Sequence, residues 1–182
     1  MEAVNNNCLP LGKLIELVGD EDSGKTFYAL DILNKNSNYG NIGVYINIDK
    51  TISNNTYLNK NVIIINESKS KNIITILNEL LKTNAINLIV VDSIPLLNEN
   101  IQTIKNFIKE ITRLTAKYNI TSILVNQYRY FNGREVPFLN NILKRYSSMT
   151  INTTNNIEEK SIYVSYKSYK MKIKNNNKII YY

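Results

Sequence analysis

The residues from Gly19 to Thr26 have the types and spacing of a phosphate-binding loop. They fit the pattern G-x-x-x-x-G-K-[ST] at every fixed position. An apolar run at residues 13–18 precedes them, and apolar residues at helical spacing follow over residues 27–33. Glycines let successive backbone N–H groups turn toward an anion, and the N-terminus of a helix adds partial positive charge. Because the pattern stands between a predicted strand and a predicted helix, the sequence predicts a site for a nucleoside triphosphate.

Two side chains of this loop have defined chemical roles. Lys25 would reach the β- and γ-phosphates, and the Thr26 hydroxyl would hold Mg²⁺. A glycine turn beside an ordinary surface lysine is the alternative, and the flanking strand and helix argue against it. The residues expected to contact the nucleotide here are Gly19, Asp20, Glu21, Asp22, Ser23, Gly24, Lys25, Thr26 and Phe27.

Three further polar residues each follow an apolar run typical of a buried strand. Asp92 follows four aliphatic residues and would bind Mg²⁺ directly or through water, although it could instead cap a helix, a role for which Ser93 competes. Asp49 could be the general base that activates water, or an exposed turn residue. Gln127 could sense the γ-phosphate by hydrogen bonding. Since ligands of open α/β sheets bind beyond the carboxyl ends of the strands, these residues are expected to meet the loop.

The order of the predicted elements indicates an α/β fold. Apolar strands alternate with amphipathic helices, which argues for a mostly parallel sheet flanked by helices on both faces. Past about Met149 the pattern changes to strict alternation, which predicts short antiparallel strands at the C-terminus. Without a long linker or repeat, residues 1–182 are expected to form a single domain. Beyond the first strand and helix, strands are predicted at 42–48, 62–65, 88–93 and 121–125, and helices at about 71–82 and 101–114.

Composition limits the chemistry and the location of the protein. Histidine is absent, which excludes imidazole-based catalysis, and the single cysteine, Cys8, allows no internal disulfide. No apolar run is long enough for a membrane span and no leader opens the chain, so a cytoplasmic location is expected. The net charge is +7, and residues 160–182 hold six lysines and no acid. That basic segment favours either a phosphate-rich partner or a strand edge protected by lysines.

Taken together, the motifs resemble those of bacterial RecA recombinases. The resemblance runs in order from about Leu9 to Ser148. It implies a P-loop, RecA-like ATPase core that uses ATP and Mg²⁺ and assembles on single-stranded DNA. The segments that carry it are Cys8–Leu17 leading into the phosphate loop (the family's Walker A motif), Val44–Asp49, Leu88–Ser93 (the Walker B strand), Ile123–Arg129 and Leu143–Ser148.

Several roles follow from the resemblance, residue by residue. Lys25, Thr26, Asp92 and Gln127 match the family's nucleotide and metal residues, whereas Asp49 stands where the family has its catalytic glutamate. A carboxylate that is one methylene shorter is drawn back by about 1.5 Å, near the limit of hydrogen-bond reach. The acids Asp20, Glu21 and Asp22 beside a polyphosphate should weaken ATP binding unless a cation offsets them. Tyr57 lies near the family's adenine-stacking position, and Lys167 and Lys170 near lysines that reach a neighbouring subunit's ATP.

The segment from Tyr128 to Phe138 matches the family's second DNA-binding loop, whereas the first loop is cut to a few residues at 95–98. Rings that stack on bases and cations that meet phosphates are what sequence-tolerant binding of single strands requires. A partly buried loop tip is the alternative in a protein with 13 tyrosines. The expected DNA-binding residues are Tyr128, Arg129, Tyr130, Phe131 and Arg134.

Three functional hypotheses follow. The first is a DNA-dependent ATPase that binds single-stranded DNA, acts in recombination or repair, associates with the nucleoid and either self-assembles or joins a recombinase. The family's N-terminal docking segment and C-terminal DNA-gathering domain are expected to be absent. The second is a weakly hydrolysing paralogue, resembling archaeal RadB-type proteins, that regulates a full-length recombinase. The third is a P-loop ATPase or kinase with no role on DNA, against which the lack of an arginine-rich lid segment argues.

Overall fold

A computed structural model describes residues 9–37, 41–50, 52, 58–83, 85–156, 161–166, 169–174 and 179–181, with side chains described as far as Thr154. Its helices and strands follow one another in the order expected for an α/β protein, up to the strands at the C-terminal end. The elements are β1 (Leu14–Gly19), α1 (Lys25–Ser37), β2 (Ile42–Asn47), β3 (Val62–Ile65), α2 (Ser70–Thr83), β4 (Ile86–Asp92), the 3₁₀ helix η1 (Ile94–Leu97), α3 (Ile101–Lys117), β5 (Thr121–Phe131), β6 (Arg134–Pro137), α4 (Asn140–Tyr146), β7 (Met149–Asn156), β8 (Ser161–Tyr166), β9 (Tyr169–Lys174) and β10 (Ile179–Tyr181).

One sheet joins the ten described strands. Its order is β10-β9-β8-β7-β1-β5-β4-β2-β3, and β6 pairs with β5 beside this path. All pairings from β7 to β3 are parallel, whereas β8, β9 and β10 add in antiparallel register. The predicted mostly parallel α/β fold with antiparallel strands at the C-terminus is therefore confirmed. The change of direction begins at β8 and not at Met149, because α4 returns the chain to the β1 edge in a parallel crossover.

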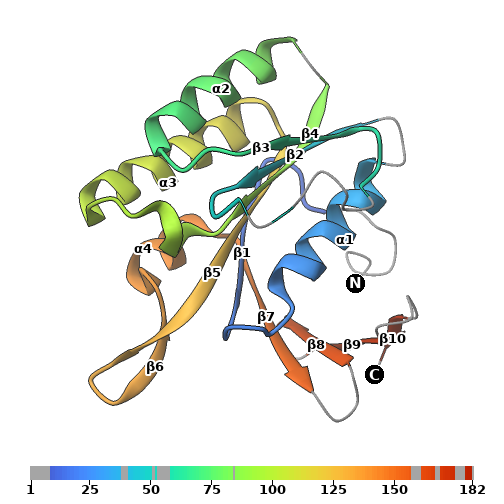
Figure 1. Cartoon of the computed structure of the whole chain (residues 1–182), viewed down its shortest axis with the longest axis vertical. Coiled ribbons are helices and arrows are strands. Elements are labelled where there is room, and N and C mark those ends of the chain that lie inside the picture. Colours follow the sequence, from blue (N-terminus) through green and yellow to red (C-terminus); the bar gives the residue numbers. More distant parts are fainter. Residues whose placement is uncertain are drawn as a thin grey trace.

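Helices cover both faces of the sheet. Helix α1 packs on one face, while α2, α3 and α4 lie on the other (Figure 1). Alternate residues of each strand face opposite sides, so each strand contributes to two apolar clusters. On β1, for example, Ile15 and Leu17 pack beneath α1, whereas Leu14 belongs to the cluster beneath α2 and α3.

Three local features differ from the expectation. The segment predicted as the second DNA-binding loop is a β-hairpin, because β5 continues to Phe131 and pairs with β6. Helix α4 was not predicted, since seven residues show too little periodicity. The short segment after Asp92 is η1, whose N-cap residue Ser93 makes no capping hydrogen bond through its side chain. The following helix, α3, is capped instead by Asn100, whose side chain accepts from the Thr103 N–H at 2.8 Å.

Across the described residues, none of the helices combines the length and the apolar character that crossing a membrane requires.

Candidate nucleotide site and the adjoining hairpin

The loop between β1 and α1 has the backbone of an anion-binding nest. Its φ angle is positive at Asp22 (56°) and at Gly24 (83°), on either side of Ser23, and an alternation of this kind is what turns neighbouring N–H groups toward an anion. Gly19 is required by space, since a Cβ there would lie 2.3 Å from both Ser23 Oγ and Thr153 Oγ1. These two hydroxyls are themselves hydrogen-bonded at 2.9 Å, which ties the loop to β7.

Lys25 is folded inward on this loop and is almost fully buried. Its ammonium donates to the carbonyl of Gly19 at 3.0 Å, to the carbonyl of Asp20 and, at 3.4 Å, to Ser23 Oγ. Burial lowers the pKa of Lys25, while the nearby carboxylates, Asp92 first among them, act in the opposite direction. The cation therefore lies inside the loop, where phosphate oxygens could replace the carbonyls it now meets.

The carboxylate of Asp92, at the end of β4, receives two hydrogen bonds on one oxygen. Thr26 Oγ1 donates to Oδ2 at 2.7 Å, and the Tyr45 hydroxyl donates to the same atom at 2.6 Å. Burial raises the pKa of Asp92 and the charge of Asp49 adds to this, whereas the two hydrogen bonds lower it. Asp92 therefore holds Thr26 and does not cap a helix. The sequence did not predict a role for Tyr45 at this site, because its position is that of an ordinary apolar residue in a buried strand.

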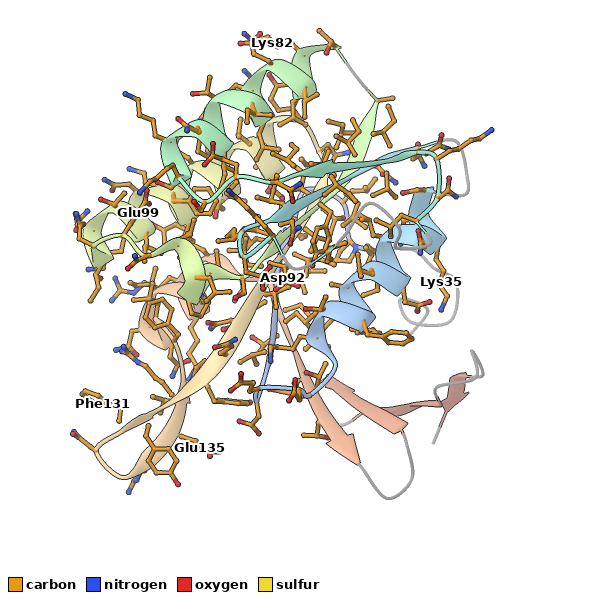
Figure 2. The ribbon with its side chains drawn as sticks, in the orientation of Figure 1. Lys35, Lys82, Asp92, Glu99, Phe131 and Glu135 are labelled. Atoms are coloured by element: carbon orange, nitrogen blue, oxygen red, sulfur yellow. The ribbon has the colours of Figure 1, made fainter. Side chains whose placement is uncertain are left out.

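The remaining strand-end residues lie at the same edge of the sheet. Gln127 on β5 is the register partner of Gly19, the last residue of β1. Asn47, the last residue of β2, pairs with Asp92. Asp49 follows two residues later, is exposed and lies close enough for its charge to act on Asp92. The structure thus places Asp92 against Thr26 and Gln127 beside Gly19, whereas Asp49 is linked to the site only through its charge on Asp92 (Figure 2 shows Asp92 between α1 and the strands).

The residues present suit ATP and Mg²⁺. The nest, the inward-turned ammonium and the start of α1 form a cradle for an anion. A hydroxyl and a carboxylate in mutual contact offer the oxygen ligands that Mg²⁺ prefers. Asp20, Glu21 and Asp22 are exposed at the rim, and Phe27 is partly exposed on the first turn of α1. Tyr57 and Lys167 lie outside the described residues, and of Lys170 only the backbone position in β9 is described.

The β5–β6 hairpin begins one residue after Gln127. Tyr130 and Phe131 are 76% and 59% exposed, and the exposed Arg129 lies over two rings, 6.0 Å from the centroid of Phe131 and 5.1 Å from that of Phe138. Arg134 is also exposed, as the partner of Phe131. Figure 2 shows Phe131 and Glu135 on the hairpin that projects from the sheet.

Tyr128 and Glu135 limit the aromatic and cationic surface of this hairpin. Tyr128 is half-buried, whereas Tyr130 is exposed. The Tyr128 hydroxyl donates to Asn152 Oδ1 at 2.9 Å and so ties the hairpin to β7. Tyr128 is therefore less available to a ligand than Tyr130. Burial raises the pKa of Tyr128. Glu135, the register partner of Tyr130, places an acid among the expected DNA-binding residues.

A buried polar network joins the nucleotide strand to the base of the hairpin. Asn126 Nδ2 donates to Glu16 Oε1 at 2.7 Å and to the carbonyl of Phe138 at 2.9 Å. Thr150 Oγ1 donates to Glu16 Oε2 at 3.2 Å. Burial raises the pKa of Glu16, and the hydrogen bonds and the charge of Lys144 offset part of that rise. No sequence pattern predicts this network, although the position of Glu16 in the middle of an apolar strand indicates that the acid needs buried hydrogen-bond partners.

Comparison with known proteins agrees with the sequence motifs. Residues 2–103 match the family model of the RecA N-terminal domain. The chain is 32% identical over 175 residues to Protein RecA of Mycoplasma genitalium, covering 81% of this chain and 51% of that protein. It is 28% identical to Protein RecA of Mycoplasma pneumoniae (81% and 52% covered) and 29% identical to a plasmid Protein RecA of Lactococcus lactis (78% and 48%). The chain thus spans about half the length of these relatives.

Proposed function

Because the chain belongs to the family of the RecA N-terminal domain, we propose that it is an ATPase that acts in DNA recombination or repair. Its affinity for single-stranded DNA would depend on the nucleotide that it binds. The observation that carries this proposal is the register of β1 and β5. Gly19 opens the phosphate loop and its partner Gln127 immediately precedes the hairpin. A contact between Gln127 and a terminal phosphate would therefore act on the first residues of the hairpin.

Each residue of the site has a role in this proposal. Lys25 exchanges its carbonyl partners for β- and γ-phosphate oxygens, and Thr26 and Asp92 hold Mg²⁺, which when bound neutralises phosphate charge. Asp49 accepts the proton of the attacking water as general base. Gln127 hydrogen-bonds the γ-phosphate and thereby distinguishes ATP from ADP. The three acids at the loop rim make the affinity for ATP depend strongly on the cation.

The hairpin would be the DNA-binding element. Exposed rings at Tyr130 and Phe131 offer stacking surfaces, and the Arg129 and Arg134 cations can meet the phosphates on either side. Such contacts are tolerant of base sequence. We further propose that residues 1–182 act as a single ATPase domain in the cytoplasm, by the nucleoid, and either assemble with copies of themselves or join a recombinase.

A second candidate is a regulatory paralogue that binds ATP but hydrolyses it slowly. The short Asp49 side chain and the acids Asp20, Glu21 and Asp22 favour it, since one weakens general base catalysis and the others weaken binding of the triphosphate. Filament length on DNA, measured by electron microscopy, separates the two candidates, because a regulator would form only isolated particles.

The test is the anisotropy of a labelled oligo(dT) at one fixed salt concentration, since phosphate contacts make affinity depend strongly on salt. Wild type is compared in a slowly hydrolysed ATP analogue and in ADP, alongside Lys25→Ala and, as a matched control, Lys109→Ala on the exposed face of α3. We expect tighter binding with the analogue, no nucleotide response in Lys25→Ala and a normal response in Lys109→Ala. Binding that ignores the nucleotide in wild type would refute the coupling.

A further inference from the structure

Tyr45 contacts the proposed metal site from outside the phosphate loop. It lies on β2, its side chain is 1% exposed, and its hydroxyl donates to Asp92 Oδ2 at 2.6 Å. This is the length of a charge-assisted O–H···O⁻ bond. Thr26 Oγ1 donates to the same oxygen at 2.7 Å. One oxygen of the carboxylate is therefore held from two directions, by α1 and by β2.

The sheet explains how Tyr45 reaches this position. Its register partner on β4 is Val90, which lies two residues before Asp92, so Tyr45, Val90 and Asp92 share the face of the sheet that α1 covers. The ring is packed in the apolar cluster beneath α1, and the hydroxyl extends past Val90 to the end of the neighbouring strand. A buried ring fixed in this way has one position for its hydroxyl.

We propose that Tyr45 is a positioning residue for the metal site: its hydroxyl holds Asp92 Oδ2, so that the other carboxylate oxygen, Oδ1, would be the one available to Mg²⁺. This inference rests on the proposed binding of a Mg²⁺-nucleotide. It predicts that the Tyr45 hydroxyl lowers the concentration of Mg²⁺ at which the nucleotide binds.

The hydrogen-bonding capacity of the three groups supports the assignment. A carboxylate oxygen that accepts two hydrogen bonds has both of its in-plane acceptor sites engaged, which leaves the second oxygen for a metal or its water. The Thr26 hydroxyl gives its proton to Asp92 and keeps its lone pairs for the cation. A phenylalanine at position 45 would fill the same space but leave Oδ2 with one donor. The carboxylate could then turn about its Cβ–Cγ bond, and the oxygen offered to the metal would no longer be defined.

The test is the Tyr45→Phe variant, with Tyr118→Phe at the end of α3 as a control that removes a hydroxyl far from Asp92. A fluorescent ATP analogue is titrated with MgCl₂ after treatment with EDTA, and the Mg²⁺ midpoint of binding is read from its anisotropy. Residues that orient metal ligands typically change metal affinity 10- to 100-fold. We expect a midpoint about 10-fold higher in Tyr45→Phe, by the same principle, and an unchanged midpoint in Tyr118→Phe. In an Asp92→Asn background, Tyr45→Phe should add no further shift.

The outcomes separate the inference from the function on which it rests. A wild-type protein that binds the analogue without regard to Mg²⁺ would overturn both. A wild type that needs Mg²⁺, together with a Tyr45→Phe variant of unchanged midpoint, would overturn the role of Tyr45 alone. Thermal unfolding is measured in parallel, because a purely structural hydroxyl would lower the melting temperature without moving the midpoint, and that result also refutes the proposal.

Discussion

Replacement of Asn126 by alanine probes the connection between the nucleotide strand and the hairpin. Asn126 is fully buried on β5, and its Nδ2 group donates to Glu16 Oε1 at 2.7 Å and to the Phe138 carbonyl at 2.9 Å. Alanine removes both donors at once. It leaves a buried acid on β1 and a partly buried backbone carbonyl at the foot of the hairpin with fewer partners.

The cost follows from the two hydrogen bonds. A hydrogen bond to a charged acceptor contributes roughly 1.5–3 kcal/mol, and one to a neutral carbonyl about 1 kcal/mol. Leaving the acceptors buried adds to this loss, whereas Asn126 Oδ1, which has no hydrogen-bond partner among the described residues, loses nothing when it is removed. We therefore expect Asn126→Ala to lower the free energy of unfolding at pH 7 by about 3 kcal/mol.

Urea denaturation of the wild type, Asn126→Ala, Glu16→Gln and the double variant measures this cost. The two single changes should be coupled by about 1 kcal/mol, because both act on the Asn126–Glu16 hydrogen bond: Asn126→Ala removes its donor, and Glu16→Gln removes the charge of its acceptor. Asn106→Ala on the exposed face of α3 is the matched control and should change stability by less than about 0.5 kcal/mol. A loss below about 1 kcal/mol for Asn126→Ala, with no coupling to Glu16, would refute the importance assigned to this network.

Three further predictions concern pH, the loop and the core. Burial raises the pKa of Glu16 above 4.5, so between 4.5 and that raised pKa the folded chain holds a proton that the unfolded chain has lost. The stability of the wild type relative to Glu16→Gln, measured by urea denaturation, should therefore fall as pH rises from 4.5, by up to about 1.4 kcal/mol per pH unit, and level off above the folded pKa. A difference that does not vary with pH would contradict this. Gly19→Ala should weaken binding of a fluorescent nucleotide at least about 10-fold, because its Cβ would meet two hydroxyls and the Thr153 carbonyl. Gly133→Ala strains a left-handed residue (φ 72°) at the tip of the hairpin but meets no atom within 4 Å, so it should retain nucleotide binding. Leu77→Ala, at a fully buried site of α2, should cost about 3 kcal/mol of unfolding free energy by denaturant titration, and the exposed Leu96→Ala less than about 1 kcal/mol.

The elements that the sequence predicted well are those whose information is local. The strand predicted at 62–65 is β3 with the same bounds, and the helices predicted at 71–82 and from 101 are α2 and α3. In each case a run of apolar residues at a fixed period specifies both the element and its buried face. The phosphate loop is local too, since two glycines, a lysine and a threonine at set spacing determine its turn and its place between strand and helix.

Contacts across the sheet depended on the tertiary structure. Tyr45 and Asp92 are 47 residues apart, and Asn126 and Glu16 are 110 apart, so their hydrogen bonds exist only because β2 lies beside β4 and β1 beside β5. The hairpin, too, depends on the pairing of β5 with β6, which its run of aromatic and basic residues does not predict.

The sequence by itself determined the fold class, the phosphate loop and the strand ends at which a site could form, because hydrophobic period and motif spacing are properties of neighbouring residues. Only the tertiary structure decided which polar side chains support that site. Glu16 and Tyr45 read as strand residues in the sequence. They become partners of Asn126 and Asp92 because strand order and register bring distant positions within hydrogen-bond distance, where burial makes an unpaired polar group costly.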